Sequence, residues 1–98
     1  MTVRWTYTAI EHLLAIYEYI AVDSPVYAQR MVDKITRRSQ QLANFPRSGR
    51  LVPEYQTPDI YEVIEKPYRI IYRVMDDTLD ILAIIHGAQS LPSRTDID

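Results

Sequence analysis

Hydrophobic and polar residues alternate along residues 68–86, and three polar residues at positions 76–78 interrupt the alternation. A period of two is typical of β-strands, whose successive side chains point to opposite faces. The pattern predicts a β-hairpin with Asp76, Asp77 and Thr78 in the turn. If the loop has an even number of residues, one face is apolar. The other face then carries Arg69, Arg73, Asp80 and His86. A bulged turn of odd length would place both arginines against Ile81 and Ile85, which the cost of burying charge opposes.

Two helices are predicted before this hairpin. Apolar residues recur at helical spacing over residues 9–22 and again over residues 25–42. Thr8 is followed three residues later by a glutamate, which is the spacing of a capping box. Ser24 is a favourable N-cap, and Pro25 suits the first helical position of the second helix. Because the connection is short, we expect an antiparallel helix hairpin.

Two further strands complete the predicted fold, one at residues 2–7 and one at residues 60–64. The order is β-α-α-β-β-β, and the fold class is α+β, with the helix hairpin packed on one face of a mostly antiparallel four-stranded sheet. Residues 44–58 contain three prolines and a glycine and are predicted to be one long connection. We expect a single domain over residues 1–98, in which residues 90–98 form a flexible polar tail.

Composition narrows the possible chemistry. The chain has no cysteine, which excludes disulfides and thiolate zinc sites, and no His, Asp or Glu cluster has metal-ligand spacing. Nucleotide-binding glycine motifs are missing as well. We therefore expect no metal and no cofactor. The N-terminal residues do not resemble a signal peptide, and no segment has the length of a membrane span, so we expect a cytoplasmic location and no membrane partner.

Charge is distributed unevenly although the net charge of the chain is only −2. Residues 30–50 carry a net charge of +5, and residues 51–98 carry −5. The basic segment is predicted to meet an acidic partner, and its candidate target-binding residues are Arg37, Arg38, Arg47 and Arg50. The overall balance is not that of a protein that depends on many phosphate contacts.

The charged face of the hairpin has two interpretations. It brings together Arg69, Arg73 and His86, with Arg47 and Arg50 arriving from the long connection. One interpretation is an RNA-cleaving cleft, in which arginines stabilise the phosphate and His86 or a tyrosine transfers a proton. The other is structural: Asp80 pairs with Arg73 across the strands. Arg69 likewise pairs with Glu62 or Glu65 of the neighbouring strand. We favour the structural interpretation, because these acids neutralise the charge that a phosphate needs.

Both histidines are predicted to be structural or solvated. His86 ends a strand beside Gly87, and we expect it to hydrogen-bond the chain beyond that strand. His12 lies on the first helix beside Glu11, and we expect it at the solvated surface.

Apolar residues on the charged face suggest a partner site. Ile71, Leu82 and Ile84 lie on this face, and no predicted element covers them. A partner that adds a strand or lays a helix there is expected. Such a partner would be partly apolar, with acidic residues for Arg69 and Arg73.

Five motifs in order resemble the RelE/ParE superfamily of bacterial toxins, and together they span nearly the whole chain. They are a strand with Trp5, Ser24-Pro25-x-x-Ala28, Leu42-Ala43-x-Phe45-Pro46-x-x-Gly49-Arg50, Tyr68-Arg69-Ile70-Ile71-Tyr72-Arg73-Val74 and Ile84-Ile85-His86-Gly87-Ala88. The resemblance implies the toxin of a type II toxin–antitoxin module, held inactive by a cognate antitoxin. Its implied assembly is a homodimer or a toxin–antitoxin heterotetramer.

The resemblance is closer to the ParE branch, which implies an inhibitor of DNA gyrase. Arg69 matches the arginine of both branches, but RelE-like nucleases carry lysines where this chain has residues 63–65. Tyr61 and Gln89 stand where the family usually has arginine. The alternatives are a RelE-like ribosome-dependent mRNA endoribonuclease, with Arg69, Arg73 and His86 as catalytic residues, and a degenerate toxin that only binds antitoxin. The predicted antitoxin-binding residues are Arg69, Ile71, Arg73, Leu82 and Ile84.

Overall fold

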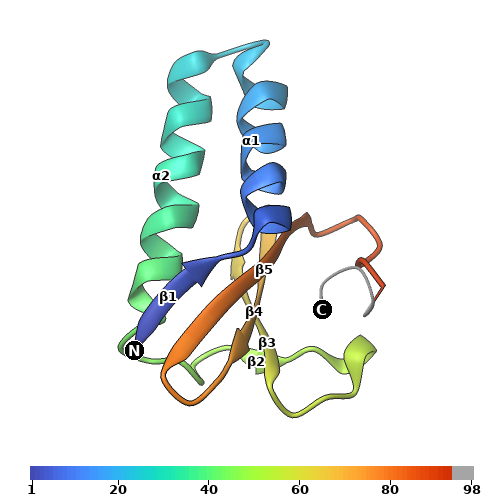
Figure 1. Cartoon of the computed structure of the whole chain (residues 1–98). Helices are drawn as coiled ribbons and strands as arrows, with labels where there is room; N and C mark the ends of the chain where they lie inside the picture. Colours follow the sequence, from blue (N-terminus) through green and yellow to red (C-terminus); the bar gives the residue numbers. More distant parts are fainter. Residues whose placement is uncertain (94–98) are drawn as a thin grey trace.

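The computed structural model describes residues 1–93 and contains two helices on one five-stranded sheet (Figure 1). The elements are β1 (Thr2–Trp5), α1 (Tyr7–Ala21), α2 (Pro25–Gln41), β2 (Arg50–Leu51), the 3₁₀ helix η1 (Pro53–Tyr55), β3 (Ile60–Glu65), β4 (Tyr68–Val74) and β5 (Thr78–His86). The α+β class and the helix hairpin are confirmed. The fifth strand is β2, which lies inside the predicted long connection. Two residues are too few to produce a periodic pattern, so the sequence did not indicate it.

The sheet has the strand order β1-β5-β4-β3-β2. The strand β1 runs parallel to β5, with Trp5 opposite Ile81, and the other neighbouring strands are antiparallel. The first strand of the chain therefore lies beside the last one, and β2 forms the opposite edge.

Helix α1 begins earlier than predicted. Its N-cap is Thr6, not Thr8, and the Thr6 hydroxyl accepts a hydrogen bond from the Ala9 N–H at 3.1 Å. The same hydroxyl donates to the carbonyl oxygen of Ile81 at 2.9 Å. Thr6 thus joins the cap of α1 to the end of the β1–β5 pairing, a tertiary contact that a local capping pattern cannot reveal.

Helix α2 begins as the sequence predicts. Ser24 is the N-cap, and its hydroxyl accepts from the Tyr27 N–H at 3.1 Å. Pro25 occupies the first helical position, where a missing N–H leaves no hydrogen bond unmade.

The sheet is covered on both faces. On the helix side, buried residues of α1 and α2 pack on the sheet residues Ile70, Tyr72, Leu79, Ile81 and Ile84, and we call this cluster the helix-side core. On the opposite side, Val52, Tyr55, Ile60, Ile71, Leu82, Ala83 and Ile85 form a second cluster, the far-side core. Figure 1 shows the helices on one side of the sheet and η1 with the chain after β5 on the other.

The hairpin of β4 and β5 has the predicted register only near its turn. Arg73 lies opposite Asp80, but a register shift at Leu82 brings Ile71 opposite Ala83. Because one inserted residue exchanges the faces of every residue beyond it, the predicted faces of Ile84 and His86 are wrong. Ile84 is buried in the helix-side core. The turn itself comprises residues 75–77, and Thr78 already belongs to β5.

The start of α1 supplies the hydrogen bonds that this bulge requires. The Thr6 hydroxyl is 3.3 Å from the carbonyl oxygen of Leu82, and the Ile84 N–H donates to Nδ1 of His12 at 3.1 Å. Backbone groups next to a bulge lose their regular ladder partners, and buried ones need others. The prediction that His12 is a solvated surface residue is therefore wrong.

Residues 90–93, the first part of the predicted flexible tail, lie against the far-side core. Leu91 packs on that cluster, and the Tyr55 hydroxyl donates to the carbonyl oxygen of Pro92 at 2.6 Å. The rest of the predicted tail, residues 94–98, lies outside the described residues.

The two possible caps of α1 can be separated by mutation. Thr6→Ala removes both the cap and the bond to Ile81, so we expect the free energy of unfolding to fall by about 1–2 kcal/mol. Thr8→Ala, the matched control in the first turn, is expected to change it by less than about 0.5 kcal/mol. Urea denaturation measures both, and an equal loss in the two variants would contradict Thr6 as the cap.

Candidate functional site

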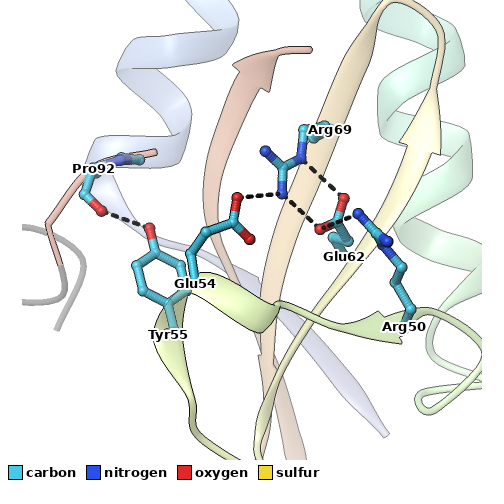
Figure 2. A network of polar contacts seen from close by, with 6 residues as sticks. All are labelled: Arg50, Glu54, Tyr55, Glu62, Arg69 and Pro92. Atoms are coloured by element: carbon cyan, nitrogen blue, oxygen red, sulfur yellow. Dashed lines mark hydrogen bonds and ion pairs between the residues drawn. The ribbon is translucent and has the colours of Figure 1, made fainter. Parts of the chain in front are cut away.

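A buried ion pair lies on the far side of the sheet, between β3 and β4 (Figure 2). The Arg69 guanidinium donates to both carboxylate oxygens of Glu62, from Nε at 2.9 Å and from Nη2 at 2.7 Å. The Glu62 side chain is 0% exposed and that of Arg69 is 12% exposed. A bidentate pair of this kind is the geometry in which arginine holds a carboxylate most tightly.

Two further charged residues extend the pair towards the surface. Nη2 of Arg50 lies 3.5 Å from Glu62, and Glu54 of η1 lies 3.6 Å from Nη2 of Arg69. Figure 2 shows Glu54 and Arg50 approaching the pair from the segment that begins with β2. The hydrogen bond to Glu62 raises the pKa of Arg69, although burial opposes the rise. Arg69 is therefore charged and its guanidinium is already occupied by carboxylates.

The structural interpretation of the charged face is confirmed for Arg69 and revised for Arg73. Glu62, not Glu65, holds Arg69. Asp80 lies opposite Arg73 in the register, but its carboxylate accepts from Arg4 at 2.9 and 3.2 Å. Nε of Arg73 lies 3.4 Å from Asp59 instead. The sequence could not indicate Arg4 as the partner, because that contact depends on the placement of β1 beside β5.

His86 does not join the two arginines. Beyond the bulge it lies opposite Tyr68, and the two rings meet edge to face with centroids 5.7 Å apart. Its Nδ1 accepts from the Ala88 N–H at 3.2 Å, as the structural interpretation of this histidine predicts. Arg69 lies opposite Ile85 and so belongs to the other face. The three residues of the nuclease hypothesis are thus divided between the two sides of the sheet.

The four basic residues predicted to bind the target do not lie on one face of the molecule. Arg50 points to the far side, towards Glu62. Arg47 lies on the helix side, where Nη1 donates to the Tyr61 hydroxyl at 2.8 Å and the guanidinium stands 5.9 Å from the centre of that ring. Arg37 is exposed on α2, and Arg38 is half-buried.

Gly49 fixes the loop that carries Arg47. A Cβ atom at Gly49 would lie 2.3 Å from the carbonyl oxygen of Glu62 and 2.7 Å from the Tyr72 hydroxyl, so no other residue fits without a shift. Its N–H donates to the Tyr72 hydroxyl at 3.1 Å, and the Tyr72 and Tyr61 rings stack 5.7 Å apart. Burial raises the pKa of Tyr72, whereas the Gly49 N–H and the charge of Arg38 oppose this rise.

Metal and membrane features are missing from the part of the chain that the structure describes. No group of three or more His, Asp or Glu residues within residues 1–93 could hold a metal ion. Neither α1 nor α2 is long and apolar enough to cross a bilayer.

Comparison with known proteins identifies the family. Residues 3–91 match the family model described as the ParE toxin of the type II toxin–antitoxin system parDE. The chain belongs to this family. It is therefore the toxin of a type II toxin–antitoxin module within the RelE/ParE superfamily, and a cognate antitoxin is its expected partner.

Relatives of the toxin agree with this assignment. Toxin RelE2 of Caulobacter vibrioides is 39% identical over 88 residues, which cover 89% of this chain and 96% of the relative. The solved structure titled chromosomal ParDE TA system from P. aeruginosa superposes with a TM-score of 0.73 at 27% identity. That match covers 88% of the toxin and 95% of the other chain.

The predicted antitoxin-binding face is not open in the toxin. Ile71 and Leu82 are buried in the far-side core, beneath Val52, Tyr55 and Leu91 of the chain itself. Ile84 lies on the other face. The expectation that no element covers these residues is wrong, because the segment after β2 and the chain after β5 fold back over the sheet. Antitoxin binding by the five residues stays a prediction, and only Arg69 and Arg73 of the set retain partial exposure.

The two departures from the usual family arginines have structural roles. Tyr61 receives the hydrogen bond of Arg47, and Oε1 of Gln89 accepts from the His86 N–H at 2.9 Å. The sequence identified both positions but not their partners. It also named Glu62 only as one of two possible partners of Arg69. Alternation alone does not show which of the two glutamates lies on the same face of the sheet as Arg69.

Removing the Glu62 charge tests the buried pair. Glu62→Gln leaves Arg69 poorly compensated, and we expect the free energy of unfolding to fall by about 3–5 kcal/mol. The control Glu54→Gln affects an exposed partner of the same arginine and is expected to cost less than about 1 kcal/mol. Urea denaturation at neutral pH measures the free energy of unfolding of both variants. Similar losses of stability would show that the buried pair contributes no more than the exposed one.

The pH dependence of stability tests His12. Burial lowers the pKa of His12 from the ordinary value of 6.5, because it penalises the charged ring, and the charge of Glu11 opposes this shift. The neutral ring is the form whose Nδ1 can accept from the Ile84 N–H. The unfolded chain then binds more protons, so His12 contributes stability above pH 6.5 that is lost as the pH falls towards its folded-state pKa. His12→Asn keeps an acceptor near the same place but does not titrate. We expect the wild type to lose more stability than this variant between about pH 7 and pH 5, and parallel curves would contradict the prediction.

Proposed function

We propose that the toxin inhibits DNA gyrase by binding to it, in the manner implied by the ParE branch, and that it does not cleave RNA. The observation that carries the proposal is the ion pair of Arg69 with Glu62. This arginine is the residue that a nuclease would use to stabilise phosphate, and here both oxygens of a buried carboxylate occupy it.

The energy of the pair argues against its use in catalysis. For Arg69 to bind a phosphate, it would have to leave Glu62, whose carboxylate is fully buried. Breaking a buried pair by removing one partner typically costs about 3–5 kcal/mol. A catalytic site gains most from charges that are already placed and uncompensated, so this arrangement favours a structural role for Arg69.

His86, the proton-transfer residue of the nuclease hypothesis, does not lie beside Arg69 and Arg73. The Nδ1 atom of His86 is engaged with the Ala88 N–H, and the ring lies on the helix side of the sheet. The match to the ParE toxin family model further supports inhibition by binding.

One observation favours the ribonuclease alternative. Arg50, Lys66 and Arg69 line a hollow of about 360 Å³ beside the buried pair, and such a cluster of cations could meet a phosphate. Glu62 lines the same hollow, however, and offsets part of this charge. The name of the relative RelE2 points to the same alternative. A degenerate toxin that only binds antitoxin is the third possibility.

Induction of the chain in a bacterial host, with pulse-labelling of DNA and protein synthesis, separates these functions. The control is the double variant Glu62→Leu, Arg69→Met, which replaces the ion pair by apolar side chains. Such replacements are often neutral or stabilising, so the variant is expected to fold, and circular dichroism checks this. Arg69→Ala alone would leave the buried Glu62 carboxylate without its cation and destabilise the fold. A loss of toxicity in that variant could then not be separated from a loss of folding.

We expect DNA synthesis to fail first, and we expect the double variant to remain toxic. If protein synthesis stops first and the folded double variant is harmless, the proposal is wrong and Arg69 acts in a nuclease. Growth without any defect on expression of the wild type would leave antitoxin binding as the remaining function.

A further inference from the structure

We infer that five residues at the β2 edge of the sheet form the surface that binds the target, and that it takes an acidic, partly apolar segment of a protein. They are Arg38, Phe45, Arg47, Leu51 and Tyr61, and we call them the edge patch. The inference rests on the proposed function, because it concerns the target and not the antitoxin.

The edge patch combines residues of α2, β2 and β3 with two residues of the loop between α2 and β2. Leu51 lies opposite Tyr61 in the pairing of β2 with β3, so their side chains share a face. Arg47 joins this face through the Tyr61 hydroxyl, at 2.8 Å. Arg38 arrives from α2, near enough to Tyr72 for its charge to act on that hydroxyl.

Arg47, one of the two cations of the patch, is held in place. Arg47 donates to Tyr61, Tyr61 stacks on Tyr72, and the Tyr72 hydroxyl accepts from Gly49 of the same loop. This closed set of contacts limits the number of rotamers that Arg47 samples. A charged side chain that is ordered before binding loses less entropy when a partner arrives.

Two apolar residues of the patch are exposed: Phe45, which lies two residues before Arg47 in the same loop, and Leu51, which is opposite Tyr61 in the register. Phe45 is 68% exposed and Leu51 is 48% exposed. Aromatic and arginine side chains are the residues that most often dominate the energy of protein interfaces. An ordered arginine in the same loop as an exposed phenylalanine therefore favours a protein partner that offers an apolar pocket and a carboxylate.

Charge complementarity indicates that the segment of the partner that binds here is negatively charged. Residues 30–50 carry a net charge of +5, and their single acid, Asp33, accepts from Gln29 on α2 at 3.0 Å. The buried Glu62 is paired on the other face, with Arg69 and Arg50. Arg38 and Arg47 thus keep a positive field on the helix side that an acidic segment would offset.

The same charges fit a nucleic acid less well. The net charge of the chain is −2, and residues 51–98 carry −5. Proteins that bind nucleic acid through many phosphates need a continuous basic surface. The patch instead mixes two arginines with two exposed apolar residues.

Binding of the purified full-length toxin to purified gyrase subunits, measured by biolayer interferometry, tests the inference. We expect Phe45→Ala and Arg47→Glu each to weaken binding roughly tenfold or more. The matched controls are Tyr7→Ala, which truncates another exposed aromatic, and Arg30→Glu, which makes the same change of charge at an exposed position of α2, outside the patch. Both controls are expected to bind like the wild type, and circular dichroism verifies the fold of all four variants.

Equal binding by patch variants and wild type would overturn the inference. So would a wild type that binds a single-stranded RNA oligonucleotide, if the patch variants lose that binding, because the patch would then be a nucleic-acid surface. If the wild type binds no gyrase subunit, the proposed function is wrong, but the inference about the patch is still open. It is then tested by growth arrest on induction of the patch variants. Folded patch variants that no longer arrest growth, when the wild type binds no RNA oligonucleotide, would support it with another protein as the target, and variants that still arrest growth would overturn it.

Discussion

The bidentate pair of Glu62 and Arg69 is the constraint around which the far side of the toxin is built. A carboxylate with no exposed surface needs a cation at hydrogen-bond distance, and the bulge in β5 places that cation opposite the apolar Ile85. The pair therefore makes possible a register that would otherwise bury an unpaired charge. The segment after β2 then covers the pair and the apolar residues beside it, and the sheet acquires a second core.

Most of the secondary structure could be predicted from the sequence, because helices and long strands follow local periodicity. The α+β class, the helix hairpin and the start of α2 at Pro25 are examples. The bulge at Leu82 could not be predicted, since its hydrogen-bond partners, Thr6 and His12, lie more than seventy residues away along the chain. The two-residue strand β2 and the contacts of Leu91 escaped prediction for the same reason: each depends on tertiary packing.

The candidate site was predictable in part. Charge opposite charge on neighbouring strands indicated that an acid would hold Arg69, and the structure selects Glu62. Assigning His86 and Ile84 to the same face failed, because parity arguments assume an unbroken ladder. The family resemblance was independent of such register errors, and this is why the family could be recognised although Ile84 and His86 were assigned to the wrong face.

The parallel pairing of β1 with β5 links the two ends of the fold and has a consequence during synthesis. Thr2–Trp5 leaves the ribosome more than seventy residues before its sheet partner, residues 78–81. The cap of α1 and the His12 acceptor likewise wait for residues 81–84. Contacts of such long sequence separation slow folding. A nascent toxin thus has no completed sheet until β5 has been translated, so β1 must wait for its partner while the helix hairpin is already synthesised.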